Sequence, residues 1–156
     1  MTTAMKGTVG TKQAVLCTDG GARGNPGPAA IGVVLNIVHE RPVEISDVIG
    51  ETTNNVAEYR ALLRGLEEAR RRGVTDLECR LDSELVVKQL NRVYKVRDAD
   101  LAPLFIRVWN AAQAFRHIQF RSIPREENRE ADRLVNAALT QAGHPKKSLR
   151  VPLTSA

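Results

Sequence analysis

Three segments near the start of the chain have the hydrophobic pattern of β-strands. Apolar residues dominate "QAVLCTD" (13–19), "AAIGVVLNIV" (29–38) and "VEISDVIGE" (43–51), and turn-forming residues separate them. The segment from His39 to Pro42 joins the second and third strands in the manner of a hairpin. The pattern therefore predicts three antiparallel strands at the beginning of the fold.

The pattern becomes helical between Asn55 and Arg72. One face is apolar and the opposite face is charged, which is typical of a helix that lies on a sheet. The apolar face contains Ala57, Ala61, Leu62, Leu66 and Ala69, and the solvated face contains Arg60, Arg64, Glu67, Glu68 and Arg71. Gly73 is expected to end this helix.

The second half of the chain alternates between strands and helices. The predicted elements are a buried strand "LECRLD" (77–82), helices over 83–91 and 99–116, a strand "HIQFRSI" (117–123) and a last helix between Pro124 and Gly143. Asp82 or Ser83 is expected to cap the helix over 83–91, and Phe105 and Trp109 are expected in the core. The order is βββαβααβα, in which the strand followed by a helix indicates a parallel crossover.

The length and composition are those of one globular domain. The chain has 156 residues, of which 42% are hydrophobic and 26% charged. We expect the domain to cover residues 13–143, with mobile tails at 1–12 and 144–156, where the sequence lacks apolar periodicity. The sequence contains no apolar run of bilayer length and no stretch resembling a signal peptide, so it predicts a cytoplasmic protein.

The charge of the chain favours a polyanionic partner. The formal net charge is +5 and the pI is near 9.6. Arginine supplies most of the positive charge, and its forked guanidinium is the side chain best suited to binding phosphate.

Cysteine and histidine chemistry is not indicated. Cys17 and Cys79 lie in strand-like apolar runs, so we interpret both as reduced core residues, and they cannot form a zinc site of cysteine-pair type. His39, His117 and His144 are expected on the surface or at strand edges, and none lies in a Ser/His/Asp-like setting. The sequence therefore argues against a nucleophilic triad.

Four acidic residues interrupt the apolar patterns. Asp19 and Asp82 each end a predicted strand, Glu58 lies on the apolar face of its helix, and Asp132 lies in the first turn of the last helix. Each has an ordinary explanation as a turn former, a helix cap or a complement to the helix dipole. A parallel crossover would nevertheless place Asp82 near Asp19, at the carboxyl ends of strands where open sheets bind ligands.

Converging carboxylates need a counter-charge. Two unit charges roughly 4 Å apart repel by about 4 kcal/mol even at an effective dielectric constant near 20. Divalent cations relieve this repulsion, and Mg²⁺ uses a few carboxylates while it keeps water and phosphate as its other ligands. The sequence therefore predicts metal-dependent phosphodiester cleavage, in which two ions activate water without a protein nucleophile.

Four spaced motifs give the chain a family resemblance. "TDGGARGNPGPAAIG", "TTNNVAEYRALLRGLE", "LDSELVVKQLN" and "PREENREADRLVNAAL" occur in this order and resemble ribonuclease H of type 1, from about Val15 to Ala142. The resemblance implies an α/β fold with a five-stranded mixed sheet and helices on both faces. It also implies a monomeric endonuclease that uses Mg²⁺ or Mn²⁺ to cleave the RNA strand of RNA/DNA hybrids.

The family's four catalytic carboxylates fall on the acids named above. By resemblance, Asp19 bridges two metal ions, Asp132 completes the site that activates water, and Glu58 and Asp82 hold the ion that faces the leaving 3′ oxygen. The products would carry 5′-phosphate and 3′-hydroxyl ends.

The resemblance also implies substrate contacts. Backbone groups of Gly20, Gly21 and Ala22 and the amide of Asn25 match groups that contact ribose hydroxyls, which distinguish RNA from DNA. The candidate contacts to the DNA strand and minor groove are Thr53, Asn54, Asn55, Ser83 and Glu84. We expect the glycines after Asp19 to serve the close approach of the substrate backbone.

The chain departs from the family pattern at three places. The loop "RSIPREENREAD" has no histidine, although many relatives place there a mobile histidine that is proposed to help product release. The basic arm "NRVYKVRDADLAP" is short and contains Arg92, Lys95 and Arg97. Glu84 stands where others carry glutamine. These departures put turnover and the position of hybrid contacts in question.

Three alternatives remain open at the level of sequence. The enzyme could also cleave double-stranded RNA, as some short-armed relatives with "PREEN"-like loops do. It could be a hybrid-binding module that has lost catalysis, which the basic charge favours and the four acids oppose. It could also be a resolvase- or transposase-like nuclease, because related sheets serve several phosphoryl-transfer enzymes.

Overall fold

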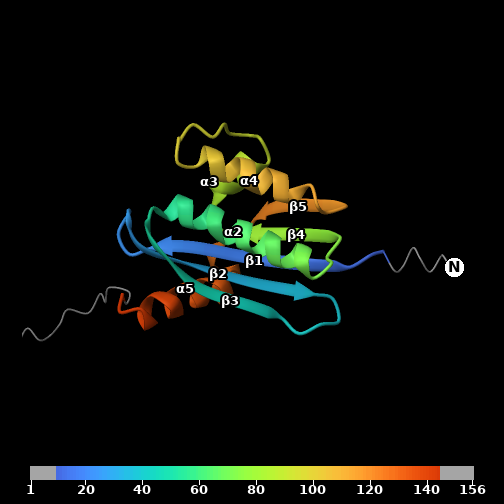
Figure 1. Cartoon of the computed structure of the whole chain (residues 1–156), viewed down its shortest axis with the longest axis horizontal. Helices are drawn as coiled ribbons and strands as arrows, with labels where there is room; N and C mark the ends of the chain where they lie inside the picture. The colour runs from blue at the N-terminus through green and yellow to red at the C-terminus, as the bar shows by residue number, and fades with distance from the viewer. Residues whose placement is uncertain (1–9, 145–156) are drawn as a thin grey trace, which may run out of the picture.

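The first three strands form an antiparallel meander, as the alternating pattern predicts. The computed structural model describes residues 10–144 (Figure 1). Strand β1 (Gln13–Ala22) pairs with β2 (Gly27–Ile37), and β2 pairs with β3 (Val43–Thr52). Apolar side chains of β1 and β2 alternate between the two faces of the sheet, and both faces are buried against helices.

The fourth and fifth strands extend the sheet on the other side of β1. Strand β4 (Asp76–Leu81) is parallel to β1, and β5 (His117–Ser122) is parallel to β4. The strand order is β3-β2-β1-β4-β5, which confirms the five-stranded mixed sheet and the parallel crossover. Because β1 and β4 run side by side in the same direction, the residues that follow them meet at one edge of the sheet.

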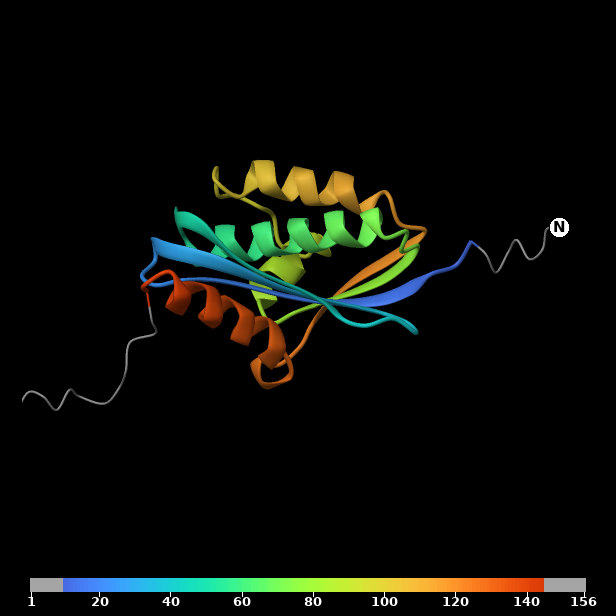
Figure 2. The ribbon, with the colours of Figure 1, turned by 60° about the horizontal axis from the view of Figure 1, so that its bottom comes forward.

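Helices cover both faces of the sheet, as expected (Figure 2). Helices α2 (Asn54–Arg71) and α4 (Ala102–Ala112) lie on one face, and α5 (Arg129–Gln141) lies on the other. The short helix α3 (Glu84–Leu90) contacts α2 and β5, and a 3₁₀ turn, η1 (Arg125–Glu127), precedes α5. No helix within residues 10–144 combines the length and the apolar character that crossing a bilayer requires.

Helix α4 is shorter than the predicted span of 99–116. Proline lacks a backbone N–H and is tolerated in the first turn of a helix, so Pro103 places the start of α4 at Ala102. At the other end, the backbone N–H of Arg116 donates to the carbonyl of Thr75 (2.8 Å), which already belongs to the approach to β5. The core prediction for Trp109 is also wrong, because this side chain is 38% exposed.

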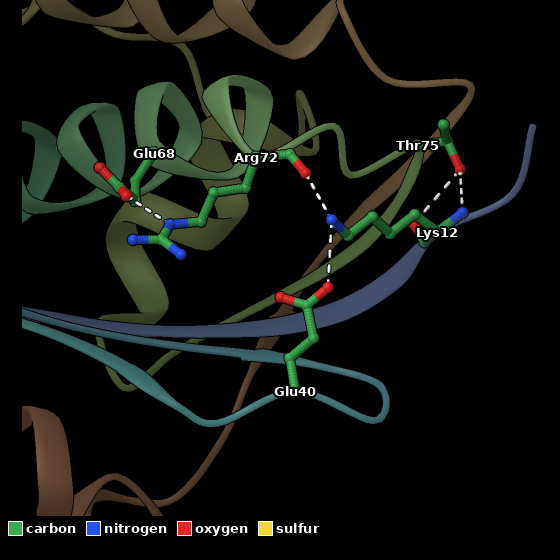
Figure 3. Close-up of polar contacts among 5 residues, drawn as sticks. All are labelled: Lys12, Glu40, Glu68, Arg72 and Thr75. Atoms are coloured by element: carbon green, nitrogen blue, oxygen red, sulfur yellow. Dashed lines mark hydrogen bonds and ion pairs between the residues drawn. The ribbon is translucent and has the colours of Figure 1, made fainter.

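Glu68 is buried, although the helical pattern assigned it to the solvated face of α2 (Figure 3). Glu68 is only 9% exposed. Its carboxylate accepts a hydrogen bond from Nε of Arg72 at 2.5 Å (Figure 3). It accepts another from Arg71. The Arg72 hydrogen bond lowers the pKa of Glu68. Two guanidinium partners therefore make burial of this charge tolerable.

Lys12 ties the start of β1 to two neighbouring elements (Figure 3). Its Nζ donates to the carbonyl of Arg72 (2.7 Å) and pairs with Glu40 (3.1 Å), while its backbone N–H donates to Oγ1 of Thr75 (2.8 Å). Lys12 thus has defined contacts, although the predicted tail included it. Most of the predicted tails, residues 1–9 and 145–156, lie outside the described residues.

Candidate active site

Three of the four predicted acids lie together at the carboxyl edge of β1 and β4. Asp19 lies near the end of β1, Asp82 directly follows β4, and Glu58 comes from the second turn of α2. One carboxylate oxygen of each lies within 4.8 Å of the others. The fold therefore gathers side chains that are far apart in the sequence into one group of oxygen ligands.

The fourth acid, Asp132, lies on the other side of Asp19. It projects from the first turn of α5, and its carboxyl group lies close enough to Asp19 to raise the pKa of Asp19. Glu58, by contrast, is influenced by Asp19 and Asp82. Asp19 is thus the central carboxylate of the four, which is the position that a residue shared by two cations would need.

Burial and mutual repulsion disfavour the charged forms of these acids. Asp19 is 7% exposed and Glu58 is 8% exposed. Burial first, and then the charges of Asp82 and Asp132, raise the pKa of Asp19 from 3.8 to about 8. The same two causes, burial and the charges of Asp19 and Asp82, raise the pKa of Glu58 well above its ordinary value. The group therefore needs either protons or cations to be stable at neutral pH.

The residues fit divalent cations. Within residues 10–144 no hydrogen-bond donor reaches Oε1 of Glu58, although this atom is buried. An unpaired buried carboxylate oxygen is costly in a protein, but it is a suitable ligand for a hard cation. The carboxylates of Asp19, Glu58, Asp82 and Asp132 are the groups that would hold such ions.

Gly20 allows α2 to approach β1 closely enough to place Glu58. A Cβ atom at this position would lie 2.2 Å from the carbonyl carbon of Ala57 and 2.5 Å from the backbone nitrogen of Glu58. The backbone N–H of Gly20 also acts on the Glu58 carboxyl group and opposes the rise in its pKa. The sequence interpretation assigned this glycine to substrate access, whereas the structure requires it for packing between helix and strand.

Gly32 has the same function on the opposite face. A Cβ atom at Gly32 would lie 2.2 Å from the carbonyl oxygen of Ala131, the residue before Asp132. Gly32 is also the register partner of Asp19 in the β1–β2 pair. Two glycines on neighbouring strands therefore allow the helices that carry Glu58 and Asp132 to pack closely against the sheet.

We expect Gly20→Ala to destabilise the protein by roughly 3 kcal/mol, because the added methyl group overlaps backbone that cannot move without shifting α2. Gly21→Ala is the matched control, since its Cβ would lie 3.5 Å from Cγ1 of Val135, an ordinary contact. Urea unfolding monitored by circular dichroism compares the two variants. Equal stability of the two would refute the packing function of Gly20.

Two of the predicted substrate-binding residues hold neighbouring loops together. Oδ1 of Asn25 accepts a hydrogen bond from the backbone N–H of Asn54 (2.9 Å), and Oδ1 of Asn54 accepts one from the backbone N–H of Ala22 (2.8 Å). Both asparagines are exposed. These contacts occupy the side-chain oxygens in the protein, and the two amide NH₂ groups are the donors that a substrate could use.

The other predicted binding residues lie at the N-termini of α2 and α3, except Gly21, which lies on β1. Thr53 caps α2 by accepting a hydrogen bond from the N–H of Val56, and Ser83 caps α3 by accepting one from Val86 (3.3 Å each). Ser83, rather than Asp82, is therefore the cap of α3. The remaining members are Asn55 in the first turn of α2, Glu84 in the first turn of α3, and Gly21 near the end of β1.

Two asparagines and one arginine next to the acids escaped the sequence analysis. Asn128, which is 2% exposed, donates through Nδ2 to the carbonyl of Thr18 (2.9 Å) and to Oδ2 of Asp82 (3.1 Å). Nδ2 of Asn136 donates to Oδ2 of Asp132 (3.2 Å), and Arg23 donates to Oδ1 of Asn136 (2.6 Å). The spacing of four residues between Asp132 and Asn136 is the one signal in the sequence that indicates such a contact.

A patch of basic and aromatic side chains lies on α3, α4 and the segment between them. The guanidinium of Arg92 lies 5.5 Å from the ring centre of Trp109, and Nζ of Lys88 lies 5.2 Å from that of Tyr94. Arg92 and Trp109 also line a cavity of about 280 Å³ together with Phe105 and Ile106. The short arm predicted from the sequence therefore combines positive charge with exposed aromatic surface.

The chain is similar to known proteins over most of its described length. A family model described as reverse transcriptase-like matches residues 17–138. Ribonuclease HI of Halobacterium salinarum is 43% identical over 129 residues, which cover 80% of this chain and 63% of that protein. The bifunctional protein Rv2228c of Mycobacterium tuberculosis is 43% identical over 130 residues, which cover 82% of this chain but 36% of that protein.

Solved structures show the same similarity. The N-terminal RNase H domain of the mycobacterial protein superposes with a TM-score of 0.78, and the match covers 81% of this chain and 98% of that domain. LC11-RNase H1, isolated from compost, was solved in complex with an RNA/DNA hybrid. It is 45% identical with a TM-score of 0.75, and the match covers 83% of this chain and 98% of that one.

Proposed function

Because the chain belongs to the reverse transcriptase-like family and groups there with type 1 ribonucleases H, we propose that it is an endoribonuclease that hydrolyses the RNA strand of RNA/DNA hybrids. The observation that carries the proposal is the group formed by Asp19, Glu58 and Asp82, with Asp132 beside it. Its burial and repulsion suit a site that works with bound cations, and the hybrid bound by LC11-RNase H1 indicates the substrate class.

The four carboxylates would hold two Mg²⁺ ions, with Mn²⁺ as a substitute. Bound there, the ions would supply charge neutralisation, activation of the attacking water and stabilisation of the departing 3′ oxygen. Asp19 would be shared by the two ions, Asp132 would serve the ion on the side of the attacking water, and Glu58 and Asp82 would serve the other. The products would carry 5′-phosphate and 3′-hydroxyl ends.

The protein groups around the acids would recognise the hybrid. Backbone groups of residues 20–22 and the free NH₂ of Asn25 are positioned after Asp19, where ribose hydroxyls of the RNA strand would pass. Thr53, Asn54, Asn55, Ser83 and Glu84 would face the DNA strand. The patch of Arg92 and Trp109 would add phosphate and stacking contacts.

A panel of labelled duplexes tests this proposal. RNA/DNA, RNA/RNA and DNA/DNA duplexes of one sequence are incubated with the protein and Mg²⁺, Mn²⁺ or EDTA. We expect cleavage of the RNA strand of the hybrid with either metal, no cleavage in EDTA and no cleavage of DNA/DNA. Cleavage of RNA/RNA would show that the protein also cleaves double-stranded RNA. An intact hybrid after prolonged incubation would overturn the proposal.

A further inference from the structure

The turn between β1 and β2 contacts both helices that carry site acids. At one end, Arg23 donates from Nη2 to Oδ1 of Asn136 on α5 (2.6 Å). At the other end, Asn25 accepts from the backbone N–H of Asn54 at the start of α2 (2.9 Å). Asn136 follows Asp132 by one helical turn, and Asn54 precedes Glu58 by one turn. The turn therefore bridges the supports of two carboxylates that lie on opposite sides of Asp19.

The contact from Arg23 determines which end of the Asn136 amide faces Asp132. A guanidinium can only donate hydrogen bonds, so it pairs with the amide oxygen and leaves the NH₂ group for Oδ2 of Asp132 (3.2 Å). With the amide reversed, its oxygen would face the carboxylate and repel it. Within residues 10–144 Arg23 makes no hydrogen bond or ion pair with Asp132, so it acts on this residue through Asn136.

Asp132 needs such an orienting donor. It is half-buried at the start of α5, and it lies against Asp19, whose carboxylate it repels. Asp82 has an equivalent donor in Asn128 (3.1 Å). Asn136 completes this pattern, in which the side-chain amide of an asparagine donates to each of Asp82 and Asp132.

We propose that Asn136 and Arg23 are positioning residues, which orient the Asp132 carboxylate toward the cation that it shares with Asp19. The inference rests on the proposed function only for the identity of the reaction, since orientation of a carboxylate toward a cation can be measured without substrate. Neither residue contacts the reacting atoms. Their effect passes along the chain from Arg23 to Asn136 to Asp132.

Metal binding without substrate gives the first test. Titration calorimetry with Mg²⁺ or Mn²⁺ compares the wild type with Asn136→Ala, Arg23→Ala and the double variant. Removal of a group that orients a metal ligand weakens metal affinity by roughly 10- to 100-fold, and we expect this range for Asn136→Ala. The double variant should be no weaker than Asn136→Ala, because Arg23 acts through Asn136. If the losses in metal affinity of the two single variants add in the double variant, Arg23 does not act through Asn136 and the proposal is wrong.

Steady-state kinetics on a hybrid give the second test. We expect kcat to fall by roughly 10- to 100-fold in Asn136→Ala with KM changed less than about twofold, since the residue affects a carboxylate rather than substrate binding. Asn136→Asp should be worse than Asn136→Ala, because it places a second carboxylate against Asp132. An effect on KM alone would overturn the proposal and make Asn136 a substrate contact.

Arg133→Ala is the matched control on α5. Arg133 adjoins Asp132, carries the same charge as Arg23, and pairs with Glu44 on β3 at 3.4 Å. Its removal should leave metal affinity and kcat unchanged, and an equal loss would show that net charge rather than orientation is responsible. If the wild type binds metal but cleaves no duplex, the proposed function fails, while the calorimetric comparison still tests Arg23 and Asn136.

Discussion

Asp19→Asn is expected to abolish hybrid cleavage, with a loss of roughly a thousandfold or more, while hybrid binding is kept or strengthened. The amide has nearly the same shape as the carboxylate but cannot neutralise a cation. Asp19 is central among the four acids, so both predicted ions lose a negatively charged ligand at once. Loss of one negative charge also reduces repulsion of the phosphate backbone, which favours binding.

The measurement combines single-turnover cleavage with fluorescence anisotropy of a labelled hybrid. Asp47→Asn serves as the control, because Asp47 is an acid of β3 that pairs with Arg64 (3.1 Å) and is half-exposed. The control should resemble the wild type in both assays. If Asp19→Asn also behaves like the wild type in both, the catalytic assignment is wrong.

Stability without metal is expected to fall as the pH rises from about 5.5 to 8. The pKa of Asp19 is about 8 in the folded protein and 3.8 ordinarily, so between these values the folded state binds more protons than the unfolded state. The free energy of unfolding therefore decreases with pH across this window, and the contribution of the protonated acid is lost as the pH passes its folded pKa. We expect the melting temperature to fall by roughly 5 to 10 °C.

Mg²⁺ should reverse this loss, with a larger effect at pH 8 than at pH 6, because cations compete with the protons held by the acidic group. Thermal unfolding in EDTA and in Mg²⁺ across the pH range measures both trends. Asp19→Asn should reduce the slope, and the remaining slope belongs to Glu58, whose pKa burial also raises. Glu68 and Glu78 do not interfere, since arginine contacts lower their pKa and their contribution is complete above about pH 5.5. A flat profile for the wild type would contradict the prediction.

The order of elements could be predicted from the sequence because each element follows a simple hydrophobic periodicity. The acidic residues could be predicted because they interrupt or end these apolar patterns. Asp19 and Asp82 end apolar runs, and Glu58 breaks an apolar helix face, so each is visible without tertiary information. The parallel pairing of β1 and β4 followed from the intervening helix and brought Asp19 and Asp82 together. These patterns are local, and together they are consistent with one fold.

Contacts between distant segments could not be predicted in this way. Gly20 was assigned to substrate access because its packing partner, Ala57, is known only once α2 is placed. Glu68 fits the charged stripe of its helix, and its burial depends on Arg71 and Arg72 folding over it. Arg23 and Asn136 are 113 positions apart and belong to no common motif. The start of α4 could have been placed better, since Pro103 limits where that helix begins.

The close packing of α2 at Gly20 and of α5 at Gly32 determines the spacing between the acids that these helices carry. Gly32 pairs with Asp19 across the ladder, and the next pair along contains Gly20, so α2 and α5 rest against bare main chain on opposite sides of nearly the same point. The span from Glu58 to Asp132 is therefore set by the thickness of one peptide layer, which an added side chain at Gly20 or Gly32 would increase. Changes elsewhere in the interior can vary the stability of the protein without moving these acids apart.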